Sequence, residues 1–198
     1  MTDIGKIVKS NSHVDYVCQV YNPLERDVIP SPEDYAFGRF VRVAGGDGQP
    51  ALVGIIYNTI LMNPEFGALG PRLSPASELE IFAPDYLNEK ATLVGILVVG
   101  SLPADANSTP AQGIPGLSAS VDSMVATLSD EEVVRFHVGD DAPRLAYLPE
   151  LLSHTNPLIP HLVLNILEQL TAHFPAHETQ LAVLRNNLAW RTQVEQAG

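Results

Sequence analysis

The stretch GKIVKSNSHVDYVCQVY, residues 5–21, contains two runs of strand-forming residues separated by a short polar segment. In the second run the apolar and aromatic residues recur at every second position, as Val14, Tyr16, Cys18 and Val20. A period of two with β-branched and aromatic side chains is typical of a strand with one buried face. Because Ser-Asn-Ser separates the runs, the stretch predicts an opening β-hairpin.

The same stretch also contains a Gly-Lys pair near a serine, which are the residue types of a nucleotide-binding loop. A phosphate loop requires G-x-x-x-x-G-K-[ST] followed by a helix, so that several backbone N–H groups converge on the phosphates. Gly5-Lys6 has neither the earlier glycine nor the following serine or threonine, and G-x-G-x-x-G is absent from the chain. We therefore interpret Lys6 as a polar position of the first strand.

The rest of the first hundred residues continues the strand pattern. Strands are predicted in FGRFVRV (37–43), ALVGIIYNTIL (51–61), ELEIFAP (78–84) and TLVGILVVG (92–100). The glycines inside two of them, Gly54 and Gly95, predict bulges or sharp bends of the kind that barrel corners require. About six short strands with such bends indicate a small β-barrel over residues 1–100.

Residues 101–117 and the segment after them change in composition. The segment 101–117 has three prolines, two glycines and almost no charge, and is predicted to be an exposed linker between domains. Beyond it, apolar residues fall at helical spacing, as Leu117, Val121, Met124, Val125 and Leu128. Ser129 and Glu132 then form a capping-box pattern that predicts a helix over residues 130–137.

Three more helices are predicted toward the C-terminus. LAYLPELLSH (145–154) fits a short helix, and the broadly apolar run 157–174 fits a central helix with Pro160 in its first turn and Pro175 ending it. Residues 177–196 place Leu181, Leu184 and Leu188 on one face. The sequence thus predicts an α+β protein, a small N-terminal β-barrel of about six strands followed by a C-terminal helical bundle over residues 118–198.

The charge balance constrains the partner. The chain has 198 residues, 45% of them hydrophobic, and a net charge of −12. Such a chain has no basic surplus to hold nucleic acid phosphates, and it is repelled by anionic membrane surfaces. A protein partner with a basic face fits the acidity, although solubility alone also accounts for it. Because the N-terminus lacks an apolar signal core, we expect a cytoplasmic protein.

Residue types that carry chemistry form no recognisable constellation in the sequence. Cys18 is the only cysteine and is expected in the core, and a G-x-S-x-G elbow is absent. His173 and His177 are four residues apart, but Pro175 between them should end the helix. Asp140-Asp141 is interpreted as a solvated turn. We expect no metal site, no cofactor and no enzymatic activity.

One cluster in the last predicted helix combines residue types that are enriched at protein interfaces. Its members are Arg185, Asn186, Asn187, Trp190 and Arg191. The helical pattern favours packing of Trp190 in the core of the bundle, and an interaction patch is the alternative that we retain.

The first half of the chain resembles the HAS-barrel, the small β-barrel at the N-terminus of HerA-type DNA translocases and of rotary ATP synthase subunits. The resemblance covers about residues 3–100. It rests on the opening run IGKIV (4–8), the second strand, Gly38 ahead of the third, and VGII (53–56) in the fourth. It implies a role in assembly, and in HerA-type proteins a platform for a NurA-type nuclease. The ATPase core that follows the barrel in those families is missing here.

These observations lead to one functional hypothesis and two alternatives. The leading hypothesis is a non-catalytic adaptor or accessory subunit whose barrel mediates assembly, with a HerA-type ATPase, a NurA-type nuclease or a second copy as partner. The first alternative is a small-ligand-binding protein or an enzyme with an unmarked site between the barrel and the helical domain. Direct nucleic-acid binding is the second, and it conflicts with the charge.

Overall fold

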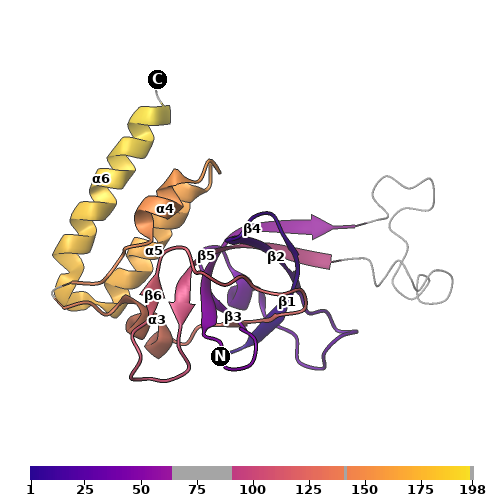
Figure 1. The fold of residues 1–198 in the computed structure, drawn as a ribbon. Coiled ribbons are helices and arrows are strands. Elements are labelled where there is room, and N and C mark those ends of the chain that lie inside the picture. The colour runs from indigo at the N-terminus through magenta and orange to yellow at the C-terminus, as the bar shows by residue number, and fades with distance from the viewer. Residues whose placement is uncertain (64–90, 141, 197–198) are drawn as a thin grey trace.

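The computed structural model describes residues 1–63, 91–140 and 142–196, with side chains as far as residue 190. It contains a closed six-stranded antiparallel β-barrel with helices packed on one side (Figure 1), so the predicted α+β class is confirmed. The strands are β1 (Asp3–Ser10), β2 (Asp15–Val20), β3 (Phe40–Val43), β4 (Ala51–Met62), β5 (Ala91–Leu102), β6 (Ala111–Gln112) and β7 (Met124–Thr127).

The barrel closes in the order β1, β7, β3, β4, β5 and β2, because β2 pairs with both β1 and β5. β6 is a two-residue strand beside the end of β5 and lies outside this ring. The predicted opening hairpin is β1–β2. Its residues alternate as expected, with Ile7, Tyr16 and Cys18 buried inside the barrel and Lys6 exposed.

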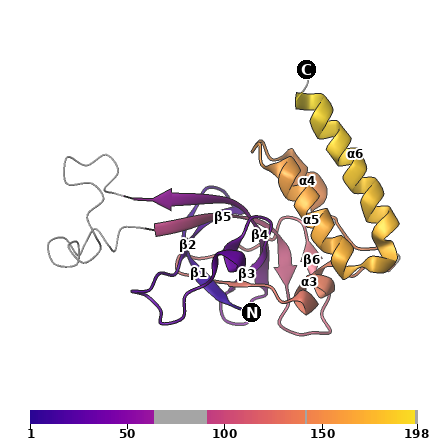
Figure 2. The same cartoon turned by 180° about the vertical axis from the view of Figure 1, so that it is seen from behind.

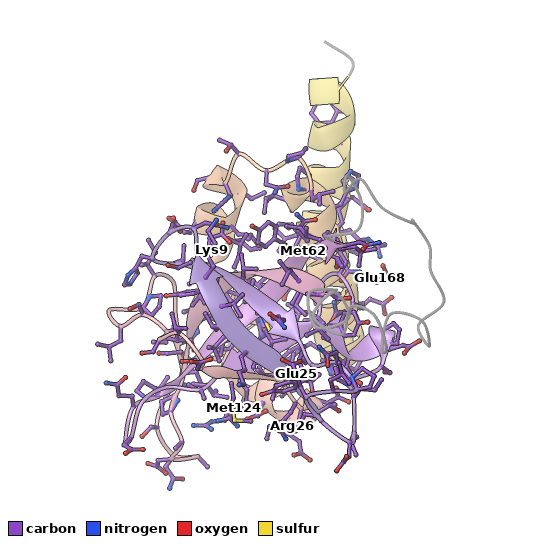
Figure 3. All side chains as sticks on the ribbon, turned by 90° about the vertical axis from the view of Figure 1, so that its right-hand side faces the viewer. Lys9, Glu25, Arg26, Met62, Met124 and Glu168 are labelled. Atoms are coloured by element: carbon purple, nitrogen blue, oxygen red, sulfur yellow. The ribbon has the colours of Figure 1, made fainter. Side chains whose placement is uncertain are left out.

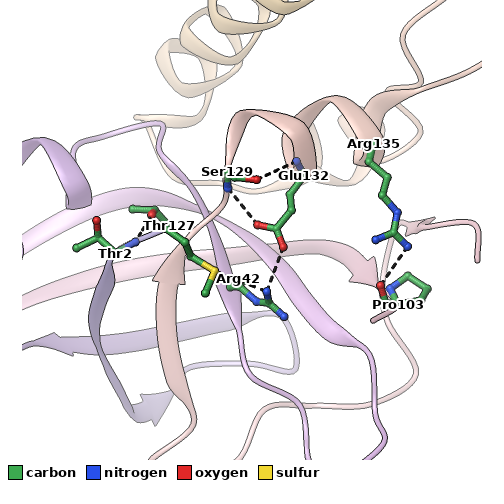
Figure 4. Close-up of polar contacts among 8 residues, drawn as sticks. Thr2, Arg42, Pro103, Thr127, Ser129, Glu132 and Arg135 are labelled. Atoms are coloured by element: carbon green, nitrogen blue, oxygen red, sulfur yellow. Dashed lines mark hydrogen bonds and ion pairs between the residues drawn. The ribbon is translucent and has the colours of Figure 1, made fainter. Parts of the chain in front are cut away.

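The helices follow the barrel in the chain. They are α3 (Asp130–His137), α4 (Leu148–Ser153), α5 (Ile159–His173) and α6 (Glu178–Gln196), with short 3-10 turns η1 (Pro32–Tyr35) and η2 (Pro175–His177). The predicted capping box begins α3: Ser129 N–H donates to Glu132 Oε2 at 3.0 Å, and Glu132 N–H donates to Ser129 Oγ at 3.2 Å (Figure 4). Glu132 also pairs with Arg42 of β3 at 3.0 Å, which connects the helix to the barrel.

The helical interpretation of residues 117–128 is wrong, because Met124–Thr127 is strand β7. It lies between β1 and β3, with Val125 opposite Gly5 and Ala126 opposite Arg42. Without it two strands of the barrel would keep unpaired N–H and C=O groups, and satisfying them outweighs a weak helical periodicity. Because β7 follows residues 101–117, the barrel draws strands from both sides of the predicted linker, which itself contains the end of β5 and the short strand β6.

Two apolar clusters share the strands of the barrel. One fills its interior and includes Ile56, Ile96 and Val125. The other covers the outer face of β3, β4 and β5 and joins it to the helices, with Val53 and Ile166 among its fully buried members. Because β4 and β5 are buried on both faces, they read in the sequence as continuous apolar runs rather than alternating ones.

Both glycines of the apolar strands lie at irregular points of the β4–β5 ladder. The register shifts between Val53 and Gly54, where an added Cβ would lie 2.4 Å from Ile96 Cγ2. It shifts again between Ile56 and Asn58, opposite Gly95, where a Cβ would lie 2.8 Å from Tyr57 Cε1. The predicted bends at these glycines are therefore confirmed, and Gly95 leaves room for the Tyr57 ring.

Two predictions, a strand over residues 78–84 and a solvated turn that includes Asp141, fall outside the described residues in whole or in part. Within residues 1–63, 91–140 and 142–196, none of the helices combines the length and the apolar character needed to cross a bilayer.

Candidate protein-docking surface

Strand β4 changes environment along its length. Residues Ala51–Tyr57 are all buried, whereas the last four residues are exposed. Ile60 is 45% exposed, Leu61 77% and Met62 52%. Three consecutive large apolar side chains in solvent are unusual, since the other described strands expose at most single ones, Val8 in β1 and Met124 in β7.

The change follows from where the neighbouring strands end. Pairing of β3 with β4 reaches Ile55, and the last backbone bonds on that side join Ile56 to Gly38 and Arg39. Pairing with β5 continues to Met62, which lies opposite Ala91. β4 and β5 thus continue past the end of β3 as a ribbon, residues 58–62 with 91–95, on the side away from the helices (Figures 1 and 2). β2 still flanks β5 at residues 93–95, so only residues 61–62 with 91–92 extend beyond both neighbouring strands.

One edge of this ribbon has no strand beside it in the part of the chain that the structure describes. Along residues 58–62, backbone groups on the β3 side of β4 have no ladder partner there. Proteins usually protect such edges with charged residues or proline. The sequences of β4 and β5, ALVGIIYNTILM and ATLVGILVVGSL, contain neither.

A groove of about 330 Å³ lies where the ribbon leaves the barrel. Figure 3 looks onto this end of the molecule and shows Met62 together with Glu25 and Arg26 of the β2–β3 connection. The groove is lined by Val20, Tyr21, Asn22, Pro23, Ile29, Pro30, Tyr35, Leu61, Met62, Asn63, Ala91 and Thr92. None of these residues is charged, although the chain carries a net charge of −12. The edge and the groove together form what we call the ribbon surface.

The wall of the groove opposite the ribbon is held by contacts within the β2–β3 connection. The Arg26 guanidinium lies 4.7 Å from the centroid of the Tyr21 ring, and its Nη1 lies 3.4 Å from Asp3 Oδ2. Asn22 N–H donates to Glu25 Oε2 at 3.0 Å. These contacts keep Tyr21 at the base of the groove, so its shape exists without a ligand.

The cluster predicted in the last helix lies on the exposed side of α6. Arg185, Asn186 and Asn187 are exposed, and Trp190 is 69% exposed, so the favoured packing of Trp190 in the bundle core is wrong. Arg191 belongs to α6, and its side chain is outside the described residues.

The packed face of α6 accounts for the exposure of Trp190. Leu181 and Leu188 pack against the apolar cluster of α5, whereas Leu184, expected on the same face, is 42% exposed. Residue 190 is nine positions from Leu181 and two from Leu188, so it points away from α5.

Two buried polar pairs were not anticipated from the sequence. In the first, Tyr57 O–H donates to Asp15 Oδ1 at 3.0 Å, and Asn11 Nδ2 donates to Asp15 Oδ2 at 3.3 Å. Burial and then the neighbouring Asp15 carboxylate raise the pKa of Tyr57 to about 12. In the sequence Asp15 is simply a polar position of a predicted strand. Nothing near it indicated the hydrogen bond from Tyr57, which lies 42 positions away.

The second pair lies between α3 and the start of α4. His137 Nδ1 is 2.7 Å from the Val133 carbonyl oxygen and therefore donates, which leaves Nε2 to accept from the Tyr147 hydroxyl at 2.9 Å. Burial lowers the pKa of His137 to about 4, so the ring is neutral at pH 7. The Phe40 ring packs against the His137 ring in a T-shaped arrangement, with the ring centroids 5.2 Å apart. The neutral imidazole therefore lies in an aromatic core rather than in an open site.

The junction of barrel and helices, where a ligand site was one alternative, is closely packed. A cavity of about 20 Å³ lies there between Leu97 and Leu151, enough for about one water molecule. A more open groove of about 640 Å³ lies between residues 106–110 and α3. At this groove Arg135 donates to the carbonyl oxygens of Pro103 and Ser108, both at 3.1 Å (Figure 4 shows the first), so its guanidinium serves to anchor the loop.

The described residues contain no group of three or more His, Cys, Asp or Glu side chains that could hold a metal ion. Cys18 lies inside the barrel as expected, and burial raises the pKa of its thiol to about 12. His173 ends α5 and His177 lies in η2 after Pro175, so the two do not share a helix.

Residues 1–197 match the family model described as a domain of unknown function, DUF8166. The match spans the barrel, the segment 101–117 and the helices together. No curated protein matches the chain.

Proposed function

We propose that this chain, a member of the DUF8166 family, is a non-catalytic assembly subunit whose barrel docks a protein through the ribbon surface. The observation that carries the proposal is the uncharged outer half of β4, which has β5 on one side and no strand on the other among the described residues, with Ile60, Leu61 and Met62 exposed. Adding a strand to such an edge is an established mode of protein recognition, in which backbone groups give affinity and side-chain pockets give specificity.

The setting that we propose is a cytoplasmic ATPase or DNA-processing complex, with a HerA-type ATPase or a NurA-type nuclease as candidate partner. It is supported by the resemblance of residues 3–100 to the HAS-barrel, and a closed six-stranded barrel is compatible with that resemblance. The net charge of −12 favours a protein partner over direct contact with nucleic acid.

The alternative of a metabolite site between barrel and helices has less support. The cavity of about 20 Å³ at that junction is far smaller than the roughly 300–1,000 Å³ of small-molecule pockets. The groove at the ribbon is large enough, but it is lined without a single charged group to orient a polar metabolite.

Site-specific photocrosslinking in the native host tests the docking proposal. A photoreactive residue is placed at Leu61, which is 77% exposed, and in a matched variant at Val183 of α6, which is 55% exposed. We expect discrete protein adducts at Leu61 and none at Val183. Adducts at Val183 alone would assign docking to the helices, and absence of adducts at both positions would contradict the proposal.

A further inference from the structure

We propose that the free edge of β4 pairs with the same edge of a second copy of this chain, antiparallel about a two-fold axis. The inference rests on the proposed docking function and names its occupant. It makes the ribbon surface a dimer interface that joins two barrels into one continuous sheet.

The backbone of β4 selects an extended strand as the occupant. Along residues 58–62 the groups facing away from β5 have no strand partner in the described part of the chain, although Thr59 N–H donates to the side-chain Oδ1 of Asn58 at 2.9 Å. The alternating N–H and C=O groups of such an edge fit another strand, which would compete with the Asn58 side chain for the Thr59 N–H. A helix has already bonded its own backbone groups and cannot satisfy these. The exposed Ile60 and Met62 side chains then gain apolar neighbours from the added strand.

The composition of the edge makes it complementary to itself. Thr59-Ile60-Leu61-Met62 is rich in strand-forming residues and has no charge, proline or glycine. When identical strands pair antiparallel about a two-fold axis, a residue on the axis faces its own copy in the second chain. When the axis lies within this run, the other residues of the run that find a partner inside it face uncharged residues of the same run. Such isologous pairing is the commonest way for a protein to form a closed dimer.

The charge distribution leaves the edge itself free of repulsion between two copies. The net charge of −12 repels another copy, yet the last five residues of β4 and the facing residues of β5 carry none of it. The ribbon projects on the side away from α5 and α6 (Figures 1 and 2), so pairing through β4 keeps the two helical regions apart. Self-pairing should therefore strengthen with salt, whereas docking of a basic partner should weaken with it.

Sedimentation of the full chain tests the dimer. We expect a monomer–dimer equilibrium that shifts toward dimer between about 0.1 M and about 1 M sodium chloride, as the Debye length falls from about 10 Å to about 3 Å. Ile60→Lys and Leu61→Lys place like charges close together across the axis and should weaken dimerisation by about tenfold or more. Val183→Lys, at an apolar position of α6 whose exposure of 55% lies between those of Ile60 and Leu61, should leave it unchanged.

Cysteine trapping reads the register. In separate variants one cysteine is placed at Thr59, Ile60, Leu61 or Met62, while native Cys18 stays because it is fully buried. Antiparallel self-pairing predicts a maximum of disulfide-linked dimer at one position, the residue nearest the axis, and little at its neighbours.

The two proposals fail differently. A monomer at all concentrations and salts, equal trapping at all four positions, or loss of the dimer in Val183→Lys would overturn the self-pairing. If that monomer still forms photocrosslinked adducts at position 61 with a different protein, the docking function stands and only its occupant changes. If Leu61 gives no adduct of any kind, the docking function fails as well.

Discussion

The two halves of strand β4 differ in burial although they belong to one continuous strand. Ala51–Tyr57 lies between the barrel interior and the helices and is buried on both faces. Thr59–Met62 continues the same ladder with β5 but has lost β3 as a neighbour and lies in solvent. The residue types barely change between the halves, so the difference comes from what surrounds each half. We conclude that the inner half carries stability, and the outer half is the part available for the proposed docking.

The strongest test of this division compares two isoleucines of β4. Ile56 is fully buried and Ile60 is 45% exposed. Ile56→Ala should destabilise the fold by about 2–5 kcal/mol, because it leaves a cavity in the barrel interior. Ile60→Ala should change stability by less than about 0.5 kcal/mol. Urea unfolding at concentrations that favour the monomer measures both, and similar losses would break the division.

The second prediction concerns the pH dependence of the free energy of unfolding, which His137 in the packed core should dominate. Because the folded pKa of His137 is about 4 and the ordinary value 6.5, the unfolded chain binds more protons between these values. Stability should therefore be full above pH 6.5 and fall by about 3 kcal/mol as the pH approaches 4.

His137→Phe is the matched control for this prediction. It keeps a ring beside Phe40 and removes the titrating group, at a constant cost because the Tyr147 hydroxyl loses its partner. Unfolding of both proteins across this pH range should show a steeper loss in the wild type. Parallel curves would mean that His137 is not buried as a neutral ring.

A smaller effect is expected at the start of α3. Ser129→Ala removes the oxygen that accepts from Glu132 N–H, and should lower the free energy of unfolding by about 1 kcal/mol. Ser153→Ala, at the end of α4 where the exposed hydroxyl bonds only locally, is the control. Thermal unfolding should separate the two variants, and equal melting temperatures would argue against the capping box.

The smallest effect on folding should come from Leu61→Lys, within about 0.5 kcal/mol, because Leu61 is 77% exposed. The same substitution should abolish most docking at the ribbon surface. A large loss of stability, measured by urea unfolding beside the wild type, would mean that the outer half of β4 is packed into the fold like the inner half.

Local signals predicted the local parts of this fold. The alternation in residues 14–20 identified β2, and Ser129 with Glu132 identified the first residue of α3, because strand periodicity and helix capping act within a few residues. Gly54 and Gly95 indicated bends that the β4–β5 ladder contains.

The features that the sequence did not predict depend on residues far apart in the chain. β7 became a strand because β1 and β3 need a neighbour, which no window around residues 124–127 could show. The apolar run 51–61 indicated a buried strand, but its exposed end depends on where β3 stops. Trp190 had the spacing of a packed helix, and its exposure depends on which face of α6 meets α5.

Hydrogen exchange of the β4 amides tests the central claim most directly. The account predicts that part of the amides of residues 58–62 exchange rapidly in dilute protein and become protected as the protein concentration rises, while those of α6 and the barrel stay unchanged. Rapid exchange at every concentration, or new protection on α6 instead, would contradict the assignment of the outer half of β4 as the self-pairing surface.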